Sequence, residues 1–166
     1  SFIKSSFPFY YGYYLAEKIC DKAKKVSRIN GQTVSSLMFH KVSDSFVEDY
    51  DTIIKKELTP QKNISFLYGP YFLTPHSGKW TINNLLEAVR QMEQENAIKS
   101  HLRQWLSLLH ESREKSNQKI SRLKAVVNDS EKNEWIDTLT DLSGNSTPVY
   151  DILSLFSTMY PETKSK

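Results

Sequence analysis

The sequence predicts an α+β fold in two parts, with helix–strand units over residues 1–76 and an all-α helical bundle over residues 77–166. Three observations predict it. A helix, a turn and a strand follow one another between Pro8 and Val42. The chain contains nine Tyr and eight Phe, and most of them lie in its first half, where extended segments are predicted. After about Pro75 only helical periodicities remain, so a domain boundary is expected there.

The stretch between Pro8 and Val42 begins as a helix packed on one face, because apolar residues recur at spacings of four and three. Pro8 stands where a helix tolerates a residue without an N–H. Asn30-Gly31 predicts a turn. Residues 34–42 are apolar on both faces, as in a central strand that is covered on both sides. The stripe of the helix consists of Tyr11, Leu15, Ile19, Ala23 and Val26.

The rest of the first part predicts one short helix and one more strand. Ser43-Asp44-Ser45 supplies a cap for a helix over about 46–57, which Thr59-Pro60 ends. Asn63–Tyr68 has the composition of a strand, and residues 69–73 form an extended or turning segment.

Helical patterns fill most of the second part. Ser100 is expected to be the N-cap of one helix, and Asp129 or Ser130 that of another. The polar residues 111–119 are either an exposed helical extension or a mobile link. The apolar faces of the expected helices lie within residues 82–92, 102–109, 120–127, 135–142 and 149–159, and the tail after Pro161 is expected to fray.

Composition excludes several classes of protein. Hydrophobic residues make up 39% of the 166-residue chain, enough for a folded core, and a net charge of +3 is compatible with nucleotide or nucleic-acid contact without being diagnostic. No apolar run reaches the length of a membrane span, and no signal peptide is visible. The chain begins without Met, so we expect a fragment or a processed piece. Cys20 is the single cysteine, which favours a reducing cytoplasm, and the four His show no metal-ligand spacing: His40, His76, His101 and His110.

Five phrases of the sequence resemble, in order, the large palm subunit of type III CRISPR effector complexes. The first is a helix with an Ala-Glu and an Ala-Lys pair followed by a strand ending in Phe-His, and the last is a Thr-Pro that opens an apolar helix. Together they cover nearly the whole chain, and they match the end of the second palm domain plus the helical domain of the family. The phrases occupy residues 9–40, 69–73, 82–92, 98–103 and 147–155.

The resemblance implies a partial ferredoxin-like palm, related to nucleotide cyclases and GGDEF domains. In this family the parent protein is a nucleotidyltransferase that makes cyclic oligoadenylates from ATP when the complex binds target RNA. Its Mg or Mn ions are held by a Gly-Gly-Asp-Asp hairpin, and two such ions activate the attacking hydroxyl and stabilise the leaving phosphate. That motif and the HD nuclease motif do not occur in this sequence. The resemblance therefore implies that the hairpin lies upstream, and that this chain alone binds neither ATP nor metal and is inactive.

Two positions depart from the family's pattern. The Arg that precedes Pro-Tyr is Gly69 here, and the Pro of an Ile-Pro-Lys-Ser phrase is missing between Ile98 and Lys99. We assign no role to these positions. The partners that the resemblance implies are the other subunits of the complex and, through it, crRNA and target RNA, in cytoplasmic antiviral defence.

Lys24 is the candidate nucleotide-binding residue. By resemblance it matches the Lys of the Ala-Lys helix, which in palm cyclases reaches the triphosphate, and a lysine suits that role as a point charge. The alternative is a solvated lysine, because Lys18, Lys22, Lys25 and Arg28 lie nearby. The rings of Tyr10–Tyr14 either stack on adenine or, as we favour, form core or subunit contacts.

The helical half offers a second hypothesis, that of a standalone helical interaction or RNA-binding module without catalytic activity. Its basic side chains either contact phosphates or form an ordinary solvated surface, and for most of them we favour the latter. A palm cyclase of the GGDEF kind is a third hypothesis, but the helical half has no place in it. The basic residues are Lys99, Arg103, Arg113, Lys115, Lys119, Arg122 and Lys124.

Overall fold

The computed structural model describes residues 8–29, 32–42, 49–76 and 78–161. It is an α-rich α+β fold, 65% helical, with small antiparallel sheets. In chain order the elements are α1 (Phe9–Val26), β1 (Arg28–Ile29), β2 (Gln32–Thr33), β3 (Ser36–Leu37), α2 (Tyr50–Glu57), β4 (Tyr71–Phe72), α3 (Ile82–Gln94), α4 (Asn96–Glu111), α5 (Arg113–Val127), α6 (Ser130–Thr140) and α7 (Val149–Met159).

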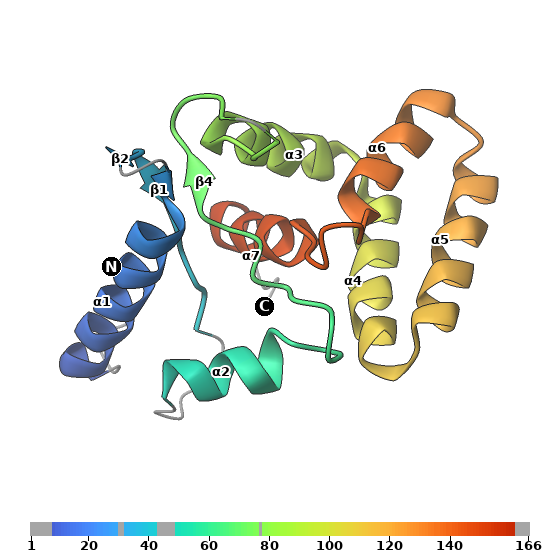
Figure 1. Ribbon diagram of the computed structural model, residues 1–166. Helices are drawn as coiled ribbons and strands as arrows, with labels where there is room; N and C mark the ends of the chain where they lie inside the picture. Colours follow the sequence, from blue (N-terminus) through green and yellow to red (C-terminus); the bar gives the residue numbers. More distant parts are fainter. Residues whose placement is uncertain (1–7, 30–31, 43–48, 77, 162–166) are drawn as a thin grey trace.

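Figure 1 shows α1, β1 and β2 at one end of the molecule and α5 at the other, with α2 below α7 between them. Helices α3 and α7 lie side by side in the middle, and α4 packs along α5. None of the helices in the part of the chain that the structure describes is both long and apolar enough to cross a membrane.

The two sheets are short antiparallel pairs. β1 and β2 form one pair, and β3 pairs with β4, so that Ser36 lies opposite Phe72 and Leu37 opposite Tyr71. The strand predicted over 34–42 is thus paired over two residues only. The predicted strand at 63–68 is wrong: no named strand forms there, although Ile64 takes part in an isolated bridge with Gln61.

Local signals explain where most helices begin. Thr81 and Asn84 form a capping box on α3: the Asn84 N–H donates to Thr81 Oγ1 at 3.2 Å, and the Thr81 N–H donates to Asn84 Oδ1 at 2.9 Å. Asp129 caps α6 as predicted, accepting from the Lys132 N–H at 3.1 Å. Ser100 is not an N-cap, because α4 begins at Asn96, directly after α3.

The polar residues 111–119 and the start of α2 differ from the predictions or lie partly outside the described residues. The polar residues 111–119 are helical on both sides of Ser112, whose hydroxyl accepts from the Lys115 N–H and caps α5. Helix α2 is capped by Asp49, and the predicted cap at 43–45 lies outside the described residues.

The main core draws residues from both sides of the boundary predicted at residue 76. Leu58, Phe66 and Tyr71 pack in it together with side chains of the helical half. Burial of each such large apolar side chain contributes roughly 1.5–3 kcal/mol. The division into two domains stays a prediction. The fully buried side chains of the helical half include Leu85, Met92, Ile98, Leu102, Trp105, Leu109, Leu123, Ile136 and Leu139.

Candidate functional site

Lys24 lies on an exposed face of α1. A helix turns by about 100° per residue, so Tyr13, Cys20 and Lys24 share one side of α1, and all three are exposed. Among the residues that the structure describes, no hydrogen bond or ion pair engages the Lys24 ammonium. The side chain is therefore available to a ligand that approaches this side of the helix.

The opposite face of α1 packs against α2 in a second, smaller core. Tyr11 and Leu15 are buried there against Tyr50 and Ile53. This confirms the first half of the predicted apolar stripe, whereas Val26 at its end is 44% exposed. The packing fixes α1 so that Lys24 points away from the body of the protein.

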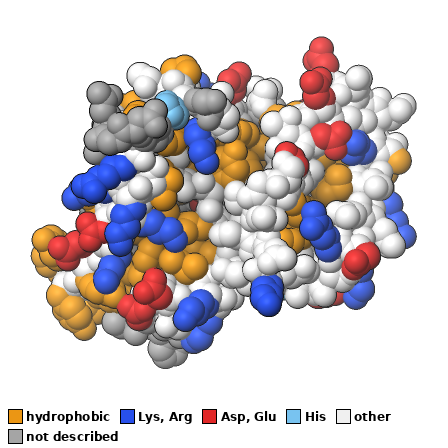
Figure 2. All heavy atoms as spheres, in the orientation of Figure 1, with side chains coloured by type: hydrophobic (Ala, Val, Ile, Leu, Met, Phe, Trp, Pro, Cys, Tyr) orange, Lys and Arg blue, Asp and Glu red, His pale blue; other side chains and the backbone are white. Residues whose placement is uncertain are grey.

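The aromatic residues at the start of α1 fall into two groups. Tyr11 is buried, and the Tyr14 hydroxyl donates to Asp49 Oδ1. That hydrogen bond raises the pKa of Tyr14 and lowers the pKa of Asp49. Phe9, Tyr10 and Tyr13 remain 77%, 69% and 62% exposed, and Figure 2 shows hydrophobic side chains at the surface of this end of the molecule. These three rings are the ones available to a base or a partner.

The other cations near Lys24 have surroundings of their own. The Lys18 ammonium lies 5.5 Å from the centre of the Tyr14 ring. Lys22 is half-buried, and burial lowers its pKa. Lys25, on the next position of α1, and Arg28, on β1, are both exposed.

A buried carboxyl group was not singled out by the sequence. Asp151, on the first turn of α7, is 6% exposed, and its Oδ2 accepts a hydrogen bond of 2.7 Å from the Tyr71 hydroxyl. Burial raises the pKa of Asp151 to about 7, although the hydrogen bonds from Tyr71 and the Gly69 N–H act in the opposite sense. The same surroundings raise the pKa of Tyr71. This group joins β4 to α7 rather than facing a ligand.

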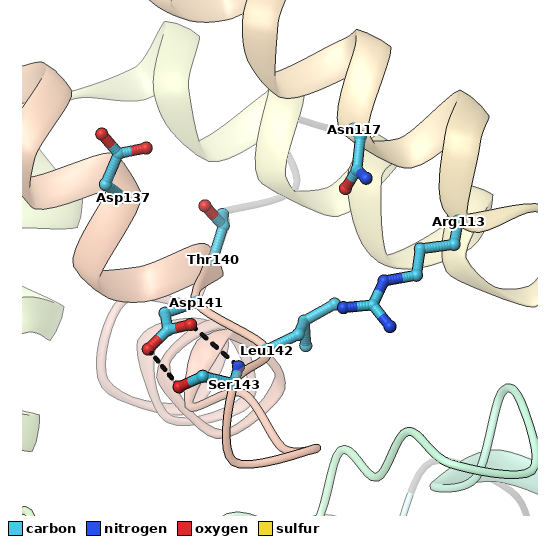
Figure 3. Close-up of a pocket in the computed structure, with 7 residues that line it drawn as sticks. All are labelled: Arg113, Asn117, Asp137, Thr140, Asp141, Leu142 and Ser143. Carbon is cyan, nitrogen blue, oxygen red and sulfur yellow. Dashed lines mark hydrogen bonds between the residues drawn. The ribbon is translucent and has the colours of Figure 1, made fainter.

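A polar hollow of about 500 Å³ lies at the other end of the molecule, between α5 and the end of α6. Figure 3 shows Arg113 and Asn117 on α5 and the acidic side chains Asp137 and Asp141 on or just after α6. The Asp141 carboxylate accepts from the Ser143 N–H and hydroxyl, both at 2.8 Å, and Asp137 is paired with a lysine. The hollow is open and its acidic groups are already bonded, so we assign it no chemistry.

The basic residues of the helical half are partly engaged. The Lys99 ammonium lies 4.2 Å from the centre of the Phe156 ring. Lys115 pairs with Glu111 at 3.1 Å and Lys124 with Asp137 at 2.6 Å. The remaining four are Arg103, Arg113 and Arg122, which are exposed, and Lys119, which is half-buried.

The described residues contain no group of three or more His, Cys, Asp or Glu side chains that could hold a metal ion. The single cysteine, Cys20, is exposed. Comparison of the chain with protein-family models, with curated proteins and with solved structures gave no match.

Proposed function

We propose that this chain is the C-terminal portion of the large subunit of a type III CRISPR effector complex, acting in cytoplasmic antiviral defence. The parent protein would be a transferase that makes cyclic oligoadenylates from ATP when target RNA binds. This part would complete the nucleotide site and contact neighbouring subunits. The observation that carries the proposal is the ordered set of five family phrases, which spans residues 9–155.

The position of Lys24 supports the proposal. The residue that matches the family's nucleotide-binding lysine stands exposed on α1, and its helix is anchored to α2 through Tyr11 and Leu15. The rings of Phe9 and Tyr13 on the same side are also uncovered. An exposed ammonium group on an anchored helix can make a charge-assisted contact with a phosphate group that another segment brings to it.

Only part of the nucleotide site would lie in this chain. Carboxylates outside this chain would hold the Mg or Mn ions, and the bound ions would supply Lewis-acid chemistry. Lys24 would hold negative charge of the triphosphate through its ammonium group, and the helix that carries it would fix that charge in position. The helical domain would contact neighbouring subunits, crRNA and target RNA.

The coding sequence that precedes Ser1 tests this proposal without a functional assay. The proposal predicts a Gly-Gly-Asp-Asp hairpin shortly upstream of α1, because the family's metal ligands stand there. An upstream sequence without paired carboxylates would overturn the proposal.

A second candidate function is that of a standalone helical module that binds RNA. One observation favours it: Lys115, Lys119 and Arg122 recur along α5 at spacings of four and three, so they share one side of that helix. Helix α5 also carries a single acidic residue, Glu114. A row of cations at this spacing suits the phosphates of a single strand.

RNA binding by the chain alone would distinguish the two functions. If the module binds RNA, affinity should fall steeply with salt, and Lys119→Ala with Arg122→Ala should reduce the slope of log K against log salt by about 1.4, roughly 0.7 for each lost phosphate contact. Lys62→Ala, an exposed lysine after α2, is the matched control and should leave the slope unchanged. If the slope falls by the same amount in the double variant and in the control, the result counts against an RNA site on α5.

A further inference from the structure

The smaller core and the main core meet between α2 and α7 (Figure 1). Ile54 of α2 packs against both cores. The Phe39 ring adds a second link, because it stacks on Tyr71 of the main core with 6.2 Å between ring centres. Lys41 Nζ adds a third, donating to the Ser157 hydroxyl of α7 at 2.6 Å. A junction made of such single contacts can open while both cores stay folded.

The Asp151 carboxyl, on the first turn of α7, lies at this junction. On one side it accepts from the Tyr71 hydroxyl of β4 at 2.7 Å. On the other side lies Tyr50 of the smaller core. Burial raises the pKa of Tyr50 to about 12, and the charges of Asp151 and Asp51 add to the effect. Asp151 therefore has neighbours in both cores.

The ionisable groups that face Asp151 are phenols, which are neutral at pH 7. They come from three elements: Tyr50 on α2, Tyr71 on β4 and Tyr150 on α7. Behind them lie His40 against the Tyr50 ring, Tyr68 against the Tyr71 ring, and the carboxylates of Asp51 and Glu57. Neither a lysine nor an arginine of the described residues lowers the pKa of Asp151. Its ionised form therefore has hydrogen bonds but no counter-ion.

The closed junction is a poor environment for the ionised carboxylate. Asp151 is 6% exposed, and burial raises its pKa to about 7 although hydrogen bonds from Tyr71 and Gly69 act in the opposite sense. The Tyr50 hydroxyl is buried as well, and no described residue forms a hydrogen bond with it. Water would reach both groups if α2 moved away from α7, so the open form suits a charged Asp151 better.

We propose that Asp151 is a proton-controlled latch: its neutral carboxyl holds the smaller core against α7, and loss of the proton releases that core. Leu58, the C-cap of α2, is buried in the main core and is the pivot. Opening hydrates the carboxyl, which then gives its proton to water, so each opening event releases one proton. Opening therefore becomes easier as pH rises toward about 7 and depends little on pH above that value. The inference rests on the contacts around Asp151 and does not depend on nucleotide binding by Lys24.

Labelling of an introduced thiol by a dithiodipyridine reagent tests the latch in the full chain. The background is Cys20→Ser, which removes the single native cysteine. Ile54→Cys reports separation of the two cores, and Val89→Cys, at a fully buried position of the main core, reports unfolding of that core. The opening constant is the labelling rate divided by that of the urea-unfolded chain at the same pH.

The opening constant at residue 54 is compared between the parent and Asp151→Asn, which cancels the contribution of His40. The ratio of parent to variant should rise about 50- to 100-fold from pH 5 to pH 8. In the parent the constant at residue 54 should exceed the constant at residue 89 at every pH. A ratio that does not rise with pH would overturn the proposal. So would equal constants at the two positions, because the junction would then open only when the main core unfolds.

Discussion

Asp151→Asn is expected to stabilise the protein at pH 8 and to change its stability little at pH 4. Burial raises the pKa of the Asp151 carboxyl from its ordinary value of 3.8 to about 7, so the folded state holds its proton more tightly than the unfolded chain. Stability from this group is therefore fully present below about pH 4 and is lost as pH rises through about 7. A shift of about three pKa units corresponds to roughly 4 kcal/mol.

An asparagine is neutral at every pH and has nearly the same shape. Its amide oxygen can accept from the Gly69 N–H while its NH₂ group donates to the Tyr71 oxygen, since a phenol both donates and accepts. The buried hydrogen bonds seen at Asp151 thus retain partners. A gain of about 2–4 kcal/mol in unfolding free energy at pH 8 is the expected result.

Urea unfolding of the variant and the parent at pH 4 and pH 8 measures this effect. The variant is compared with the parent at the same pH, because stability also depends on His40. Burial lowers the pKa of His40, so its contribution to the free energy of unfolding falls as pH falls in both proteins. Asp21→Asn on the surface of α1 is the control, and its free energy of unfolding should equal that of the parent at both pH 4 and pH 8. A variant that is no more stable than the parent at pH 8 would show that burial does not raise the pKa of the Asp151 carboxyl.

Helices were predictable where the signals that define them are local. The apolar stripe that ends at Met92 lies within α3, and the cap residue Asp129 directly precedes α6. The prediction of α7 was accurate at both ends, since Pro148 precedes it and Pro161 follows it. Ser100 misled because α4 starts directly after α3, so that a residue with cap chemistry lies inside the helix.

Strands were less predictable because pairing depends on distant segments. The apolar pattern of residues 34–42 indicated a strand covered on both faces, and the side chains of Phe39 and His40 do contact different layers. Which partner strand is present cannot be read from the segment itself. At 63–68 the apolar pattern indicated burial rather than pairing: Ile64 and Phe66 are 3% and 2% exposed, yet they belong to no named strand.

The candidate site was predictable only in part. The helical spacing placed Lys24 off the buried stripe of α1, and the side chain is exposed. Asp151 escaped attention because its partner Tyr71 lies 80 positions away, a contact that no local pattern encodes. The hollow beside Arg113 likewise depends on the packing of α5 against α6.

The proposed function predicts that Lys24→Ala in the full-length protein lowers the synthesis of cyclic oligoadenylates by about 10- to 100-fold while assembly of the complex is preserved. A charge-assisted contact with the triphosphate contributes about 1.5–3 kcal/mol, and each 1.4 kcal/mol is a factor of ten in rate. The fold should tolerate the change, because Lys24 is exposed and the described residues form no hydrogen bond or ion pair with it.

The measurement that tests the central proposal most directly is the rate of cyclic oligoadenylate formation from ATP by the assembled complex with target RNA. Lys25→Ala is the matched control, because it removes an exposed lysine from the adjacent position on α1, about 100° away around the helix. The proposal predicts that Lys24→Ala is strongly impaired and Lys25→Ala is close to the parent. Equal rates for the two variants, or no cyclic product from the parent complex, would contradict it.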